Sequence, residues 1–304
     1  MSSTDFAAIP ARAQTADPAQ GPGFVQQNLR FFRNELRLIF FRRRNQLLLL
    51  VVALFPLLIG IGLKVSAPGN GRGGGGGGPG SSAAFFNQLA GNGVFLTFIA
   101  LTLLLILVLP LAVSVISGDS VAGEAGYGTL RYLLAVPAGR TRLLIVKYLV
   151  IVAFGTAATF IVSVVGLLAG VALFPVGPVT LLSGTTVSLA DGLVRVLFVT
   201  LYISAAMAAV GAIGLAISTF TEHAIGAIAA IMILVVASEV VDQVPQFAAA
   251  GPYLPTHWWD MFDSLLRTPV DTTTMWHGLA SFAVYAVLFF LIAWARFTSA
   301  DVTS

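Results

Sequence analysis

Two carboxylates, Asp119 and Glu124, open a polar segment, residues 118–147, that separates two long apolar runs. The same segment carries basic side chains, so ion pairs within it are expected. As an ordinary surface loop, the segment would gain at most about 1 kcal/mol from each such pair. The basic residues of the segment are Arg131, Arg140, Arg142 and Lys147.

The middle of this segment predicts a short amphipathic helix. Glycines at positions 118, 123, 126 and 128 are expected to break the preceding helix, and Thr129 can cap a new one. Pro137 then ends it. A short helix held just outside a membrane can transmit force from a cytoplasmic partner. Its apolar face would consist of Leu130, Leu133 and Leu134.

The order of residues in this segment resembles the coupling segment of permeases from type-2 ATP-binding-cassette exporters, where it also lies between the second and third of six spans. The family also has an amphipathic helix before the first span and a long external, partly re-entrant segment between spans five and six. Residues 24–44 and 244–277 occupy those places. The motif covers about thirty residues. It consists of Asp119, Glu124, Gly128-Thr129-Leu130, Leu133-Leu134, Pro137, Arg140, Leu143-Leu144 and Lys147.

The resemblance implies a homodimer, or a heterodimer with a paralogue, bound to two copies of a separate cytoplasmic ATPase. The partner would bind ATP and Mg, and this chain would have no cofactor, no metal and no catalytic residue of its own. Substrate would be exported, with a hydrophobic or amphipathic molecule as the expected class. Contact with the ATPase would fall to Thr129, Leu130, Leu133, Leu134, Pro137 and Arg140, and the cytoplasmic gate to Asp119, Glu124 and Arg131.

Polar residues inside the apolar runs are candidates for a substrate path. Thr156, Thr159 and Ser163 share one helix face, and Glu239 lies near the end of a later run. Ionisable residues within membrane helices are often functional. Hydroxyls in such helices, however, usually bond to their own backbone, so packing is the alternative. Small residues at Gly166 and Gly170 predict close helix packing.

Other motifs give weaker evidence for a chemical function. The glycine run 73–78 is not followed by the Lys-Ser/Thr of a phosphate-binding loop, so we expect a flexible linker and no nucleotide site. Ser120 could serve an intramembrane hydrolase, but His277 is expected on the opposite side of the membrane. A channel or secondary transporter that works without ATP is the main alternative to the exporter. The three histidines show no metal-ligand spacing.

Composition sets the fold class that must position these residues. The 304 residues are 57% hydrophobic and only 10% charged, against about 25% charged in soluble domains. There is no cysteine and no charged tail that would suggest a nucleic-acid partner. The sequence predicts an all-α polytopic membrane protein with an interfacial helix at 24–46 and six spans. These spans are predicted at about 47–65, 93–117, 148–174, 194–220, 224–243 and 278–296, the second kinked by Pro110.

Basic residues predict the orientation. Twelve of the sixteen Lys and Arg residues fall on one side if the N-terminus is cytoplasmic, which is the positive-inside pattern. The protein is therefore expected in the plasma or inner membrane with both termini inside. Residues 1–23 and 297–304 would form cytoplasmic tails, the first disordered, and 66–92 an external loop. The remaining part, 47–296, would be the transmembrane domain.

Overall fold

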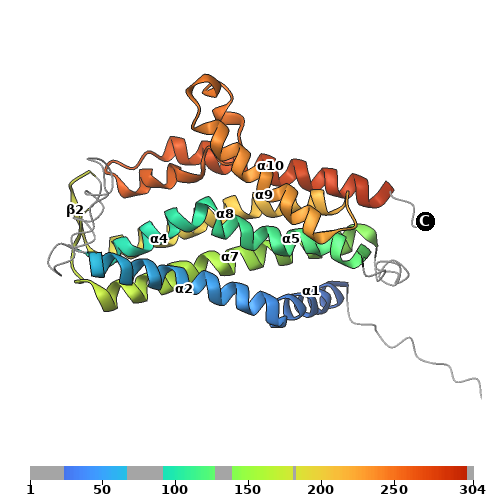
Figure 1. Ribbon diagram of the computed structural model, residues 1–304, viewed down its shortest axis with the longest axis horizontal. Helices are drawn as coiled ribbons and strands as arrows, with labels where there is room; N and C mark the ends of the chain where they lie inside the picture. Colours follow the sequence, from blue (N-terminus) through green and yellow to red (C-terminus); the bar gives the residue numbers. More distant parts are fainter. Residues whose placement is uncertain (1–23, 67–91, 127–138, 181–182, 300–304) are drawn as a thin grey trace, which may run out of the picture.

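Long helices lying side by side form an elongated bundle in the computed structural model (Figure 1). The structure describes residues 24–66, 92–126, 139–180 and 183–299. Within these ranges, six helices are long and apolar enough to cross a membrane. The expected count of six is therefore matched. These helices are α2 (Arg43–Ser66), α5 (Val108–Gly126), α7 (Arg140–Leu173), α8 (Leu189–Ser218), α9 (Ala224–Asp242) and α10 (Thr272–Ser299).

The second apolar run divides in two, as Pro110 predicts. One residue, Leu107, separates helix α4 (Phe95–Ile106) from α5, and its backbone leaves the helical conformation. Proline has no N–H to donate to the preceding turn, and its ring crowds the carbonyl four residues earlier. The break at Leu107 therefore follows from the sequence.

The helices extend further than expected at several ends. Helix α2 begins at Arg43, α7 at Arg140 and α10 at Thr272, because charged and hydroxyl residues continue each apolar helix beyond its hydrophobic core. Helix α5 also continues through Gly118 and Gly123 to Gly126, so the expected break at these glycines is wrong. Gly118 instead allows close packing, since a Cβ there would lie 2.8 Å from Cγ1 of Ile228 on α9.

Helix α8 forms the centre of the bundle. It packs against α10, α5 and α7, while α2 and α4 pack against α7 and α9 packs against α5. In the most apolar stretch of each helix, 72% of α8 is buried but only 17% of α2 and of α10. The surfaces of α2, α9 and α10 are thus largely uncovered and apolar, as expected for helices that face lipid.

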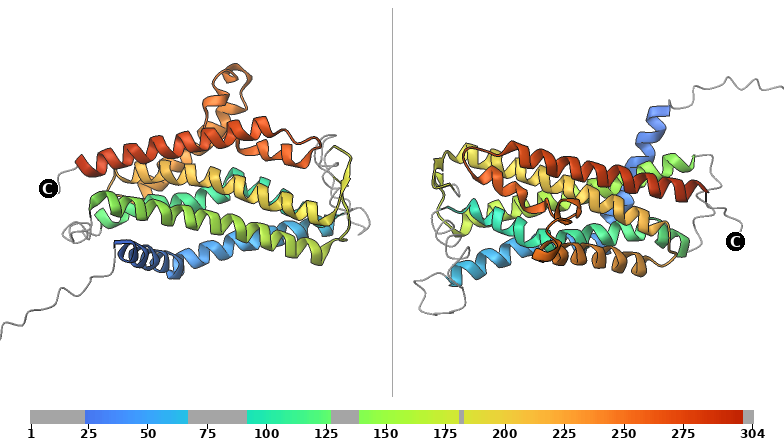
Figure 2. Two further views of the ribbon diagram at one scale, coloured as in Figure 1. Left: turned by 180° about the vertical axis from the view of Figure 1, so that it is seen from behind. Right: turned by 90° about the horizontal axis from the view of Figure 1, so that it is seen from above.

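Two ends of the bundle differ in composition. At one end, an antiparallel pair of short strands, β1 (Val179–Thr180) and β2 (Thr186–Val187), connects α7 to α8. We name this the hairpin end; Figure 2 shows it in yellow-green. At the other end lie α1 (Phe24–Phe41), the end of α5 and the C-terminal end of α10. We name it the basic end, because it carries Arg42, Arg44, Arg140 and Lys147.

The chain between α9 and α10 forms three short 3-10 helices. They are η1 (Pro245–Phe247), η2 (Gly251–Tyr253) and η3 (Trp259–Leu266). This segment projects from the side of the bundle partway along its length (orange in Figures 1 and 2), and η3 packs against α8 and α10. The Tyr202 hydroxyl of α8 donates a hydrogen bond of 2.6 Å to the carbonyl of Trp258. The segment therefore contacts α8 near the middle of that helix.

Glycines allow the closest helix contact at the hairpin end. Gly170 of α7 lies against the backbone of Gly93, and Gly166 lies against Thr97 of α4, where a Cβ would be 3.1 Å from Cα. The predicted packing role of Gly166 and Gly170 is confirmed.

We expect Gly170→Ala to destabilise the protein by about 1–3 kcal/mol, because the new methyl group would overlap the carbonyl of Gly93 and force α7 away from α4. Thermal unfolding in detergent, followed by tryptophan fluorescence, measures the change. Gly62→Ala is the matched control: nothing lies within 4 Å of its Cβ position. Equal midpoints for the two variants would contradict the packing argument.

Candidate functional site

A sharp bend between α1 and α2 directs two arginines toward the bundle. Helix α1 ends at Phe41 and α2 begins at Arg43. The amide nitrogen of the Asn45 side chain donates to the carbonyl of Ile39 at 2.9 Å, and the backbone N–H of Asn45 donates to the carbonyl of Arg42, also at 2.9 Å. Asn45 is only 1% exposed. Its hydrogen bonds satisfy the end of α1 and fix the bend.

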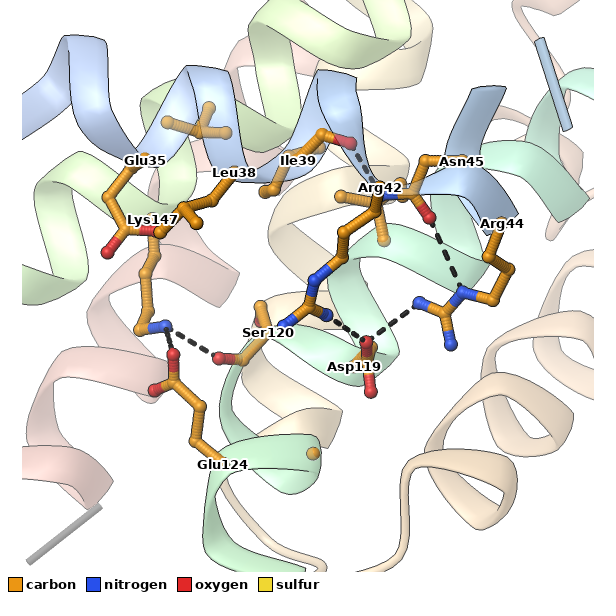
Figure 3. A pocket seen from close by; sticks show the side chains of 13 residues that line it. Glu35, Leu38, Ile39, Arg42, Arg44, Asn45, Asp119, Ser120, Glu124 and Lys147 are labelled. Carbon is orange, nitrogen blue, oxygen red and sulfur yellow. Dashed lines mark hydrogen bonds and ion pairs between the residues drawn. The ribbon is translucent and has the colours of Figure 1, made fainter. Parts of the chain in front are cut away.

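Asp119 of α5 receives both arginines. Nη2 of Arg44 lies 2.7 Å from Oδ2 of Asp119, and Nη1 of Arg42 lies 3.4 Å from the same oxygen. The carboxylate is mostly buried, while both guanidinium groups are more than half exposed. The shorter contact has the length of a charge-assisted hydrogen bond. The bend is thus tied to α5 by electrostatic contacts (Figure 3).

Lys147 of α7 forms the second ion pair. Its side chain is only 5% exposed, and Nζ lies 2.6 Å from Oε1 of Glu124 and 2.8 Å from the carbonyl oxygen of Ser120. A buried ammonium is stable only with such partners, because its removal from water is costly. These contacts join α7 to the last two turns of α5.

Glu35 of α1 faces the same ammonium group. Burial raises the pKa of the Glu35 carboxyl above its ordinary value; the charge of Lys147 acts to lower it, and that of Glu124 to raise it. Glu35 points toward Lys147 in Figure 3. Aromatic contacts hold α1 against α7, with Phe40 and Phe154 ring centroids 5.6 Å apart and the Arg142 guanidinium 5.9 Å from the Phe31 ring.

These groups surround a cavity of about 330 Å³ between α1, α2, α5 and α7. We name it the basic-end cavity. Charged and apolar side chains both contribute to its wall. The lining residues are Glu35, Leu38, Ile39, Arg42, Arg44, Asn45, Ile116, Asp119, Ser120, Gly123, Glu124, Lys147 and Val150.

The backbone of α5 beside the cavity is held by a serine of another helix. The Ser218 hydroxyl, at the end of α8, accepts hydrogen bonds from the N–H groups of Val121 and Ala122 at 3.1 and 2.9 Å. It donates to the carbonyl of Gly118 at 3.0 Å. A side chain that enters the hydrogen-bond ladder of a helix is a known cause of helix bending. Ser218 therefore fixes α5 to α8 at the level of Asp119.

Two of the three gate residues expected from the sequence lie in the described part of the chain. Asp119 and Glu124 lie in the cavity wall, where Asp119 pairs with Arg42 and Arg44, and Glu124 pairs with Lys147. Arg131 lies outside the described residues. The partners of Asp119 belong to the Arg42–Arg44 run, which the sequence analysis placed in the interfacial helix at the membrane surface. Glu35 had no signal beyond its place in an amphipathic helix.

The residues expected to contact an ATPase are mostly outside the described part of the chain. This holds for Thr129, Leu130, Leu133, Leu134 and Pro137. Arg140 is the first residue of α7, and its Nη1 donates to the carbonyl of Thr298 at 3.1 Å. The amphipathic coupling helix therefore stays a prediction, flanked by the end of α5 and the start of α7.

The expected substrate-path residues do not form one group. The Thr159 hydroxyl donates to the carbonyl of Gly155, and Ser163 is 2.6 Å from the Thr200 hydroxyl of α8. The first bond lies within α7, and the second joins α7 to α8. Thr156 is half-buried on α7, and Glu239 is half-buried on α9, which packs mainly against α5 and α8.

Ser120 and His277 lie in different surroundings. The Ser120 hydroxyl donates to the carbonyl of Ser117 at 2.6 Å, while His277 stacks on Trp258 with ring centroids 5.8 Å apart. Near it, Nδ1 of His257 is 2.6 Å from Oδ1 of Asp242. Among the described residues, no cluster of three or more His, Asp or Glu side chains has an arrangement that could hold a metal ion.

The architecture is that of a helical bundle with six helices able to cross a membrane and a charged cavity at one end. The chain belongs to the family described as "Protein of unknown function (DUF2705)", whose sequence profile matches residues 80–303. That range includes Asp119, Glu124 and Lys147, but not the α1–α2 bend. A search of curated proteins gives no match to this chain.

We expect Lys147→Met to destabilise the protein by about 1–3 kcal/mol, because the buried oxygens of Glu124 and Ser120 lose their ammonium partner. Thermal unfolding in detergent measures this. Arg267→Gln breaks an exposed pair with Asp263 at the other end and should cost at most about 1 kcal/mol.

A double variant separates the ion pair from general packing. With Lys147→Met already present, Glu124→Gln should cost less than it does in the wild type, since its carboxylate no longer faces this ammonium. Equal costs in both backgrounds would refute an energetic coupling between Glu124 and Lys147.

Proposed function

We propose that the chain is the membrane-spanning permease subunit of an ATP-binding-cassette transporter. It exports a hydrophobic or amphipathic substrate, and a separate cytoplasmic ATPase, present in two copies, hydrolyses ATP. The permease itself forms a homodimer or pairs with a paralogue. The proposal rests on the resemblance of residues 119–147 to the coupling segment of type-2 exporters and on the six apolar helices.

One observation carries the proposal furthest. The segment 127–138, where the ATPase contact is expected, connects the end of α5 to the start of α7. Glu124 and Lys147 join these same two helices close to that segment, and Asp119 connects α5 to the α1–α2 bend. A force applied to 127–138 would therefore reach three helices, α2, α5 and α7, through direct ionic contacts. This arrangement suits a subunit that receives mechanical work from a partner.

Charge supports placing the basic end in the cytoplasm. Arg42, Arg44, Arg140 and Lys147 lie at this end, and cytoplasmic ends of membrane helices are enriched in Lys and Arg. The segment between α9 and α10 would then be external. Its contact with Tyr202, deep along α8, supports a re-entrant path in the outer half of the bundle.

Co-expression with the ATPase encoded beside the gene tests the exporter. We expect a stable complex with the wild type and its loss in a Leu133→Asp, Leu134→Asp double variant, since charge would replace the apolar contact face. Val176→Asp, at the exposed hairpin end, is the control and should retain the ATPase. If no ATPase co-purifies with the wild type, the exporter is refuted in favour of an ATP-independent channel or secondary transporter.

Orientation can be measured directly because the chain has no native cysteine. Ser183→Cys, in the turn between β1 and β2, should react with a membrane-impermeant maleimide in intact cells. Glu222→Cys, between α8 and α9, should react only after permeabilisation. Both positions are exposed, so they differ mainly in side of the membrane. The reverse labelling pattern would overturn a cytoplasmic basic end.

A further inference from the structure

The basic-end cavity has guanidinium groups on one side and the Glu35 carboxylate on the other (Figure 3). On the side of the α1–α2 bend, two guanidinium groups, from Arg42 and Arg44, face one carboxylate, Asp119. On the other side, two carboxylates, from Glu35 and Glu124, face one ammonium, Lys147. Figure 3 shows the two groups separated across the cavity, with Ser120 between them. The first side carries a guanidinium group in excess, and on the second side the Glu35 carboxylate lines the cavity.

The cavity adjoins an apolar surface of α1. A second hollow of about 520 Å³ is lined by Asn34, Arg37, Leu38, Phe41 and Arg42. Leu38 and Arg42 line both hollows, which makes them neighbours. Leu38 is 59% exposed and Phe41 69% exposed. A charged cavity therefore continues onto exposed apolar side chains, as a site for an amphipathic molecule requires.

We infer that the basic-end cavity binds a zwitterionic group with a phosphate and a primary ammonium, the chemistry of an aminophospholipid headgroup. The phosphate lies against Arg42 and Arg44, which offer planar donors suited to phosphate oxygens. The ammonium lies against Glu35 on the opposite side. An attached acyl chain runs over Leu38 and Phe41. The inference needs the membrane location proposed above but is independent of ATP-driven export.

Ligands of a single charge fit this wall less well. An anionic headgroup without an amine would add a negative charge to a cavity that Glu35 and Glu124 already line, at an unfavourable Coulomb energy. A simple cation would meet the excess guanidinium charge on the bend side. A quaternary ammonium has no N–H to donate to a carboxylate. The cavity therefore selects for a primary amine together with phosphate.

Lowering the pH should weaken the preference of the cavity for a primary ammonium group. Burial raises the pKa of Glu35, so this carboxyl takes up a proton at a higher pH than an exposed glutamate does. The groups that face it are Lys147 from α7, Glu124 from α5 and Arg42 from the bend. Above the raised pKa the carboxylate accepts the ammonium; as pH falls through it, the charge is lost and the ammonium contact weakens.

The test uses the full-length chain purified alone in detergent, without an ATPase. Native mass spectrometry measures lipid retained from an equimolar mixture of phosphatidylethanolamine, phosphatidylglycerol and phosphatidylcholine with the same acyl chains. We expect phosphatidylethanolamine to be retained about tenfold over the other two, the value of one charge-assisted hydrogen bond. Glu35→Gln should abolish this preference while leaving total phospholipid similar. Arg30→Gln, an exposed α1 change outside the cavity, should leave the preference intact.

The outcomes separate the sources of the ligand. Displacement of bound lipid by soluble phosphoethanolamine would support the site and show that the group alone suffices; resistance to it, with lipid selectivity present, would assign the ligand to the membrane. Equal retention of the three lipids by wild type, or a preference unchanged in Glu35→Gln, would overturn the inference. Since no ATPase is involved, either result leaves the exporter proposal to its own experiment.

Discussion

A buried ammonium group can persist only where oxygen atoms replace its water, and Lys147 imposes this condition on the basic end. Its partners, Glu124 and the carbonyl of Ser120, both come from α5. Helix α5 must therefore run alongside α7 to at least Glu124, and it does so as an unbroken helix. Glu35 then faces the same charge from α1. The cavity, the position of α1 and the length of α5 all follow from this requirement.

The same condition explains the hydroxyl groups within the bundle. Ser114, Ser117, Thr159 and Ser204 each donate to a carbonyl of their own helix. Ser218 differs, because its hydroxyl engages three backbone groups of α5. Polar atoms in these helices thus serve mainly to satisfy one another. At the basic end, by contrast, full charges gather around an open volume.

The sequence predicts the fold better than the site. Long charge-free runs indicate spans because charge inside a bilayer is costly, and Pro110 predicts the division between α4 and α5 by its missing N–H. The glycines of α5 were misread, since the same residue type breaks an exposed helix and allows close packing in a buried one. Gly118 does the second, against Ile228 of α9, and a contact across 110 positions leaves no local pattern.

Only part of the site could be predicted from the sequence, for a similar reason. Asp119, Glu124 and Lys147 stand out as charges beside apolar runs, but their partners are set by how α1 folds back on α5 and α7. The pairing of Arg44 with Asp119 spans 75 positions. Local reasoning favoured the nearer arginines. Only the bend fixed by Asn45 shows that Arg42 and Arg44 turn toward the bundle.

The two ion pairs of α5 also limit how this helix can move. Asp119 and Glu124 are five residues apart, which is about 140° around a helix and about 7.5 Å along it. One carboxylate therefore faces the α1–α2 bend and the other faces α7. A rotation of α5 about its axis would strain both pairs at once, whereas a joint movement of α2, α5 and α7 would keep both. Movements of the basic end that conserve these contacts must carry the three helices and the cavity between them as one unit.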